Sequence, residues 1–256
     1  MAAAEATSAG GWPHDSWARH YEAVMERTFG SLYDRLTSSA LAEIDARIDK
    51  GSSVIDFGAG CGRLALPLAR RGLQVTAVEP SPAMFEELRH RAELLAGQDP
   101  EASARLTLVH TSMQGYGGDH THDLALCVFT VIAYMLDHHT LDSALRAAGG
   151  ALRPGGLLLI DVPNEEVFES MEHDTGDIIR EVSIEPLEGP LYRYRESTLI
   201  RTADGPTRYE DAFTLRRWTV DEIRDALARV GFEPGDDVEA RFRGLGACYL
   251  LWRRGR

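Results

Sequence analysis

Two acidic residues flank a glycine-rich segment in the first third of the chain. Asp56 stands two positions before the first glycine of the segment, and Glu79 comes about 20 residues after that glycine. The segment places glycine at three alternate positions, Gly58, Gly60 and Gly62. β-branched and aromatic residues at 53–57 predict a buried strand before it, and the apolar pattern of 64–73 predicts a helix after it. In such a strand–turn–helix unit the helix N-terminus directs free N–H groups at a ligand in the turn.

The same two acids decide which ligand suits the turn. A dinucleotide fingerprint needs a third glycine at position 63, where this chain has Arg63. The Asp56 carboxylate would repel a pyrophosphate, but it would attract an ammonium or sulfonium group. Glu79 closes the next predicted strand (74–78), where an acid accepts hydrogen bonds from both ribose hydroxyls. The required ligand has a ribose, a positive charge and no phosphate, and S-adenosylmethionine fits that description.

Four segments together resemble the class I S-adenosylmethionine-dependent methyltransferases, in particular the small-molecule branch that acts on natural products and amino sugars. The motif Asp56-x-Gly58-x-Gly60-x-Gly62 is similar to their first motif, and residues 78–84 are similar to the second. Residues 124–129 and 152–161, with the turn LRPGG, resemble the fourth and fifth strands. The resemblance covers 54–164 in order and resumes at 218–232. It implies S-adenosylmethionine as cofactor, S-adenosylhomocysteine as product, and methyl transfer to N or O of a small-molecule acceptor, a secondary metabolite or sugar.

The resemblance also implies which residues contact the cofactor. It places Tyr21 of the N-terminal helical segment near the methionine end, Met84 near the ribose and Phe129 beside the methionine portion, with core packing as the open alternative for Tyr21. Relatives have an acid for the adenine amino group; Ser112 stands there instead, and Met113 is placed to cover the adenine. The full set of expected cofactor-binding residues is Tyr21, Asp56, Gly58, Ala59, Gly60, Glu79, Pro80, Met84, Ser112, Met113 and Phe129.

The segment after the fourth predicted strand should face the acceptor, because ligands of open α/β sheets bind beyond the carboxyl ends of the strands. Tyr134 stands where related amino-sugar N-methyltransferases place a polar group, and we expect its hydroxyl to position the nucleophile or relay its proton. A ring packed in the core is the alternative. His139 is a candidate general base, and His138 and Asn164 are candidate contacts to the acceptor. The histidines lack metal-ligand spacing and convergent acids, so no metal is expected.

These residues require a Rossmann-like doubly wound α/β sheet, mostly parallel, with a C-terminal antiparallel hairpin, an N-terminal helical cap and an inserted small antiparallel β-sheet. We expect a tail and helical cap at 1–50, the cofactor-binding core at 51–164, the inserted sheet at 165–216 and the rest of the core at 217–256. The insert should hold three or four strands, and the hairpin should pair two. The expected strands are 178–184, 191–195, 197–201 and 209–215 in the insert, and 238–243 and 247–252 in the hairpin.

The composition of the chain limits which binding partners are expected. The 256 residues carry a formal net charge of −13, which argues against binding to nucleic acid. The three cysteines are too far apart for a disulfide framework, which fits a reducing cytoplasm. Residues 1–11 lack the basic start and apolar run of a signal peptide and are expected to form a loose tail. No apolar run is long enough to span a membrane. The expected partners are a small-molecule acceptor and, through the inserted sheet, a second copy of the chain.

Two other functions stay open at this point. An enzyme of the same fold could keep the cofactor as a scaffold for another reaction, such as a cyclisation; accumulation of S-adenosylhomocysteine with substrate separates the two. A non-catalytic binding protein on this fold is expected to lack a complete Asp56 and Glu79 pair, and this chain has both.

Overall fold

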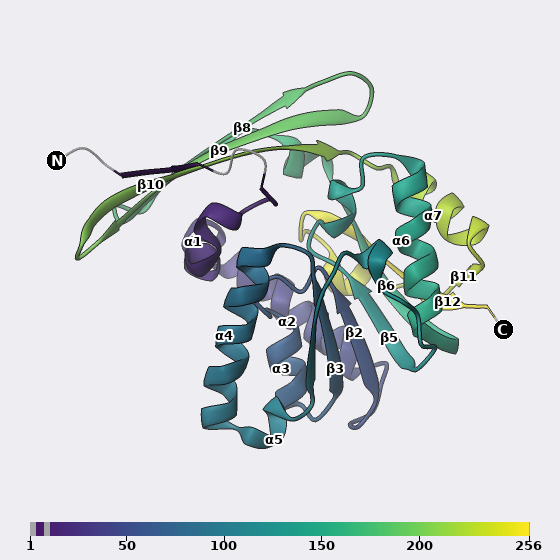
Figure 1. Ribbon diagram of the computed structural model, residues 1–256. Helices are drawn as coiled ribbons and strands as arrows, with labels where there is room; N and C mark the ends of the chain where they lie inside the picture. The colour runs from purple at the N-terminus through teal and green to yellow at the C-terminus, as the bar shows by residue number, and fades with distance from the viewer. Residues whose placement is uncertain (1–3, 8–10, 256) are drawn as a thin grey trace.

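A computed structural model describes residues 4–7 and 11–255. Its core is a seven-stranded sheet in the order β11-β12-β6-β5-β2-β3-β4 (Figure 1). The parallel strands run outward in both directions from β2, so the strand order reverses between β2 and β5, which is where open α/β sheets bind ligands. The core strands are β2 (Ser53–Phe57), β3 (Gln74–Glu79), β4 (Leu106–His110), β5 (His122–Cys127), β6 (Leu152–Pro163), β11 (Phe232–Pro234) and β12 (Ala247–Arg254).

Helices cover both faces of this sheet, because its central strands are apolar on both sides. One face packs against α2 (Ser31–Asp45), α3 (Ala65–Arg70), α4 (Pro82–Gln98), α5 (Pro100–Ser103) and α8 (Glu239–Phe242). The other face packs against α6 (His138–Ala151) and α7 (Val220–Arg229). The start of α4 follows its sequence: the Ser81 hydroxyl accepts the backbone N–H of Met84, and proline occupies the first turn.

A second sheet, antiparallel except for the parallel pairing of its edge strand β1 with β10, lies above the core, and α1 (Tyr21–Phe29) lies between the two (Figure 1). Its strands, in the order β1-β10-β9-β8-β7, are β1 (Ala4–Thr7), β10 (Gly205–Arg216), β9 (Leu191–Thr202), β8 (Ile178–Pro186) and β7 (Met171–Asp174). Its inner face packs on the N-terminal cap, which consists of the short helix η1 (Asp15–His20) and α1; Trp17 and Val24 contact Ile178 and Ile200 there.

The expected fold class is confirmed, and three local predictions are wrong. Segments 191–195 and 197–201 form one strand, so the inserted sheet has five described strands including β1. Residues 238–243 do not form a strand but contain α8, and β12 pairs with β11 instead. Val238 and Phe242 are spaced by one helical turn and both are buried. Phe242 stacks on Tyr249, with 3.7 Å between the ring centroids.

The third error concerns the tail. Residues 4–7 are paired with β10 rather than loose, because β10 offers an open edge to another strand; residues 1–3 and 8–10 of the expected tail lie outside the described part. No described helix is both long and apolar enough to cross a bilayer, and the three cysteines are free.

Candidate active site

The glycine turn after β2 is shaped by backbone conformations that only glycine adopts without strain. Gly58, Gly60 and Gly62 have φ of +73°, +55° and +88°. The N–H of Gly58 and that of Ala59 donate to the carbonyl of Val78, which fixes the turn to β3. A side chain added at Gly58 or Gly62 would meet protein atoms at 2.6 Å and 2.7 Å, whereas nothing lies within 4 Å of one added at Gly60. Gly60 therefore faces open space, as expected of a backbone that a ligand approaches.

Both predicted acids lie at this turn and are buried. Asp56 is 4% exposed and Glu79 is 6% exposed. The Glu79 carboxylate accepts the N–H of Gly60 and the N–H of Ser81, each at 2.8 Å. Burial raises the pKa of Glu79, and these two hydrogen bonds oppose the shift. Glu79 thus holds the turn through both of its carboxylate oxygens.

Asp56 has no such compensation. Burial, and secondarily the charge of Glu79, raise the pKa of Asp56 to about 7. Within the described part of the chain no group donates a hydrogen bond to its carboxylate. A cationic ligand would supply the missing partner, whereas a phosphate would add a third negative charge next to two acids.

The N-terminal cap is attached directly to the glycine turn. Ser81 donates a hydrogen bond to the Asp15 carboxylate, and the Cys61 thiol lies 3.6 Å from the carbonyl oxygen of Ala18 and 3.3 Å from the sulfur of Met84. Tyr21 stacks on Trp17 of the cap, and burial raises the pKa of its hydroxyl. Tyr21 and Met84 therefore lie beside the turn, and their contacts with the cofactor stay predictions.

Arg63 is a contact that sequence reasoning missed, although the residue itself was noted as the absent glycine. Its guanidinium lies between two aromatic rings, 3.5 Å from the centroid of Tyr33 and 4.0 Å from that of Phe129. It donates to the hydroxyl of Thr37 at 2.8 Å and to the carbonyl of Tyr33 at 2.6 Å. Arg63 therefore ties α2, the glycine turn and the segment after β5 into one unit.

Tyr134 belongs to the segment that follows β5, in the short helix η3 (Val131–Tyr134). Its hydroxyl lies 3.3 Å from Nε2 of His14, and its ring lies 5.7 Å from that of Phe213 in the inserted sheet. Tyr134 is 37% exposed, yet burial among protein atoms raises the pKa of its hydroxyl. A side chain that is both accessible and densely surrounded suits a ligand-binding position.

His14 was not predicted, because nothing in the local sequence marks it. It adopts a left-handed backbone, with φ of +65°, and its Nδ1 has no hydrogen-bond partner. That nitrogen lies 3.8 Å from the Glu196 carboxylate and 3.7 Å from the Asp211 carboxylate, both on the inner face of the inserted sheet. Burial lowers the pKa of His14 to about 4 against the pull of Glu196, so its imidazole is neutral at pH 7. Glu196 is in turn paired with buried Arg180 at 2.6 Å.

The remaining predicted residues fall into two groups. Among the residues predicted to contact the cofactor, Ser112 caps a short helix by accepting the N–H of Gly115, Met113 is buried, and the Pro80 carbonyl lies 3.2 Å from Nε2 of His110. Among the residues predicted on the acceptor side, His138 and His139 begin α6 and are exposed, with His138 beside Arg216 and Trp218. Asn164 is exposed and lines a cavity of about 480 Å³ with Trp218 and Arg217.

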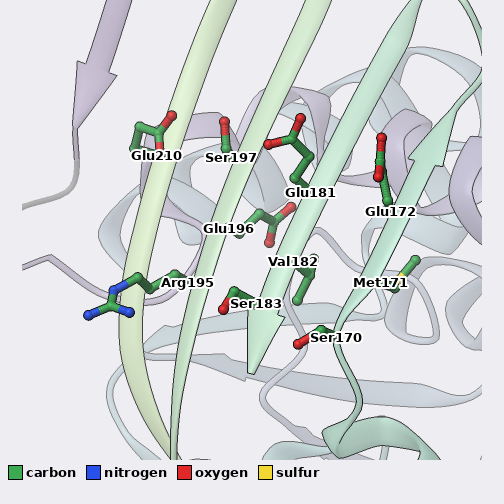
Figure 2. Close-up of a pocket in the computed structure, with 10 residues that line it drawn as sticks. All are labelled: Ser170, Met171, Glu172, Glu181, Val182, Ser183, Arg195, Glu196, Ser197 and Glu210. Carbon is green, nitrogen blue, oxygen red and sulfur yellow. The ribbon is translucent and has the colours of Figure 1, made fainter. Parts of the chain in front are cut away.

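A larger cavity, of about 540 Å³, lies on the inserted sheet, and Figure 2 shows the side chains that line it. Glu181, Ser183 and Ser197 line it and alternate along their strands with the buried Arg180, Val182 and Glu196, so their side chains point to the outer face. No residue of the glycine turn lines this cavity, so it is separate from that turn, although Glu196, which lies near His14, also lines it. Among the described residues no cluster of three His, Cys, Asp or Glu could hold a metal ion.

The comparisons agree with this geometry. Residues 54–156 match the family model described as "Methyltransferase domain". A ubiquinone biosynthesis O-methyltransferase of Methylocella silvestris is 33% identical over 43% of this chain, and the chain spans only 39% of that relative's length. Residues 54–156 therefore form a methyltransferase domain.

Two solved structures share the fold of this methyltransferase domain and its cap. An S-adenosylmethionine-dependent methyltransferase of Clostridium acetobutylicum is 15% identical with a TM-score of 0.78, over 93% of this chain and 99% of the other. The amino pentose methyltransferase CalS10 of Micromonospora echinaspora, solved with S-adenosylmethionine bound, is 23% identical with a TM-score of 0.71, over 91% and 96%.

S-adenosylmethionine is the cofactor of the domain, and the residues present fit it. The open space at Gly60 would accommodate a ligand against bare backbone, Asp56 would offer a carboxylate to its ammonium group, and Glu79 would offer one to its ribose.

Proposed function

We propose that the protein transfers the methyl group of S-adenosylmethionine to a nitrogen atom of a small-molecule amine. The observation that carries the choice of nitrogen is the chemistry of the groups around Tyr134. His14 has a pKa of about 4, and the hydroxyls of Tyr21 and Tyr134 have raised pKa values. Neither a weakly basic imidazole nor a protonated phenol removes the proton of an alcohol at pH 7. A neutral amine already has a nucleophilic lone pair and needs no such base.

The bound cofactor supplies a methyl group on a sulfonium, which is already a good leaving group. What this chain contributes is binding, orientation and exclusion of water. Tyr134 holds the acceptor through its hydroxyl, with His14 fixing the direction of that hydroxyl. Tyr21 and the rest of the cap cover the methionine end.

Similar proteins support an amino-sugar or related natural-product acceptor. The CalS10 structure is named as an amino pentose methyltransferase, and 96% of its chain is matched by 91% of this one. His138 and Asn164 as acceptor contacts, and His139 as general base, stay predictions. A homodimer through the inserted sheet, a cytoplasmic location and the lack of a nucleic-acid partner also stay predictions.

The test is transfer of label from S-adenosyl-[methyl-14C]methionine to a panel of amino sugars, each paired with the sugar that carries a hydroxyl in place of the amine. We expect label in amines and none in their hydroxyl counterparts, with one S-adenosylhomocysteine formed for each methyl transferred. Label in hydroxyl compounds alone would overturn the choice of nitrogen. S-adenosylhomocysteine formed without any methylated product would favour a different reaction.

A further inference from the structure

Two neighbouring residues after β5 have a backbone conformation that side chains disfavour. Phe129 has φ of +66° and Thr130 has φ of +69°, and neither is glycine. Consecutive left-handed residues persist only where the surroundings hold them. The Thr130 hydroxyl donates to the carbonyl of Phe129, but this bond is local and does not attach the turn to the rest of the protein.

The attachment comes from the end of β6. Asp161 is 1% exposed, and its two carboxylate oxygens lie 3.2 Å and 3.1 Å from the backbone nitrogen of Thr130, which donates to them. A hydrogen bond to a carboxylate in a buried position is among the stronger ones in a protein. Asp161 is thus the long-range partner that holds this turn.

The turn rests directly on the cofactor site. The ring of Phe129 lies 4.0 Å from the Arg63 guanidinium. Val131 occupies the place where a side chain at Gly58 would stand, since an added Cβ there would be 2.6 Å from its Cγ2 atom. Releasing the Phe129–Thr130 turn would therefore move the Phe129 ring and the Val131 side chain, which pack against Arg63 and Gly58 of the glycine turn.

The other end of the same segment is fixed independently. Trp218 donates its indole N–H to the carbonyls of Ile132 and Met135, at 3.1 Å and 3.0 Å. Tyr134 lies between these two carbonyls in the sequence. The segment is therefore held at two points, Asp161 on the cofactor side and Trp218 on the side of α7.

We propose that Asp161 is a positioning residue: by holding the Phe129–Thr130 turn, its carboxylate sets the shape of the glycine turn that receives S-adenosylmethionine. It acts through the backbone of Thr130 and not by touching the cofactor. The proposal concerns cofactor binding alone, so it stands or falls independently of whether the acceptor is an amine.

The test measures the dissociation constant of S-adenosylhomocysteine by calorimetry. Asp161→Val removes the acceptor oxygens and should weaken binding roughly tenfold, the usual order for losing a hydrogen bond to a charged group. Asp161→Asn keeps one acceptor oxygen at similar volume and should stay within about threefold of the wild type. Leu158→Ala is the control: Leu158 is buried in the same strand, so its loss lowers the melting temperature but should leave the affinity unchanged.

A rescue separates positioning from packing. Glycine adopts positive φ without strain, so Thr130→Gly lets the turn persist without Asp161. We expect Thr130→Gly alone to bind as the wild type does, and Thr130→Gly combined with Asp161→Val to recover at least about half of the lost factor on a logarithmic scale. Wild-type affinity in Asp161→Val, or a double variant no better than Asp161→Val, would overturn the proposal. Should Asp161→Val alone not fold, the double variant must fold and bind, and its failure would overturn the proposal too.

Discussion

Nε2 of His14 lies 3.3 Å from the hydroxyl oxygen of Tyr134, across 120 positions of the chain. The contact joins the N-terminal cap to the segment after β5 beneath the inserted sheet. It thereby connects three parts of the chain at one hydroxyl, and it explains how a tyrosine in a short helix can have a defined direction.

The first prediction concerns this pair. His14→Asn preserves a side chain that tolerates the left-handed backbone, but this side chain is too short to keep the contact with Tyr134. We expect kcat/KM for the acceptor to fall roughly tenfold, as does loss of one positioning hydrogen bond, with unchanged affinity for S-adenosylhomocysteine. Tyr134→Phe should lose at least as much.

The matched control for that pair is His20→Asn, a histidine of the same cap that contacts Arg19 and Tyr209 instead of Tyr134. Its kcat/KM should equal that of the wild type. If His14→Asn and His20→Asn behave alike, the contact with Tyr134 has no part in methyl transfer.

The second prediction compares two glycines of the turn. Gly60→Ala meets no protein atom within 4 Å, so its cost to folding should be only the left-handed strain, about 1 kcal/mol or a few degrees in melting temperature. The new methyl group would occupy the space of the ligand, and binding of S-adenosylhomocysteine should be lost.

Gly62→Ala should instead act mainly on stability, with a larger cost to folding than Gly60→Ala. Its Cβ would lie 2.7 Å from Leu88, so it adds overpacking of roughly 1–3 kcal/mol to the same strain. The melting temperature of each variant and its affinity for S-adenosylhomocysteine by calorimetry test this comparison. A Gly60→Ala variant that binds normally would show that the ligand lies elsewhere.

The third prediction is a pH dependence of cofactor binding. The pKa of Asp56 is raised to about 7 by burial and by Glu79, and its carboxylate must be ionised to pair with an ammonium group. Affinity for S-adenosylhomocysteine should therefore fall as the pH drops below 7, by up to about tenfold per unit. Asp56→Asn should bind more weakly at pH 8 and lose this dependence. Burial also raises the pKa of Asp161 to about 7, so Asp161 could titrate in the same pH range. Asp161→Asn is therefore the comparison, and it must retain the pH dependence of binding.

The same raised pKa predicts that ionisation of Asp56, which favours cofactor binding, destabilises the ligand-free protein. Folded Asp56 holds its proton more tightly than the unfolded chain, whose carboxyl pKa is about 3.9, so the ligand-free protein loses stability as the pH rises from about 4 to 7. Asp56→Asn removes this penalty. Its ligand-free melting temperature should exceed that of the wild type by roughly 3 °C at pH 8, and the difference should shrink at pH 5. A less stable variant at pH 8 would contradict the assignment.

The fourth prediction tests whether the acceptor amine reacts without a general base from the enzyme. If no enzyme base is needed, kcat/KM rises about tenfold per pH unit until the pKa of the acceptor amine is reached, and then levels off. Two accepted amines that differ in pKa should level off at correspondingly different pH. An inflection at one pH for both would report a group of the enzyme, and His139 would then be the first variant to measure.

Much of the core could be predicted from sequence because its signals are local. The strand, glycine turn and helix around Asp56 are encoded within about 20 residues, and Glu79 closes the adjacent strand. Ser81 likewise marks the start of α4 by its capping chemistry. Each of these predictions needs only neighbours in the chain.

The acceptor side could not be predicted in the same way. His14, Glu196 and Asp211 approach one another only after the N-terminal cap packs beneath a sheet formed far along the chain, and no local pattern encodes that contact. The error at 238–243 has a related cause. Val238 and Phe242 fit a helical turn as well as a strand, and packing against Tyr249 decides between them.

The most direct test of the account is a calorimetric titration of the wild-type protein at pH 8 with S-adenosylhomocysteine and, separately, with NAD. Asp56 and Glu79 at the glycine turn predict one site for S-adenosylhomocysteine per chain and no binding of the pyrophosphate-bearing NAD. Tight binding of NAD without binding of S-adenosylhomocysteine would contradict the account at its centre.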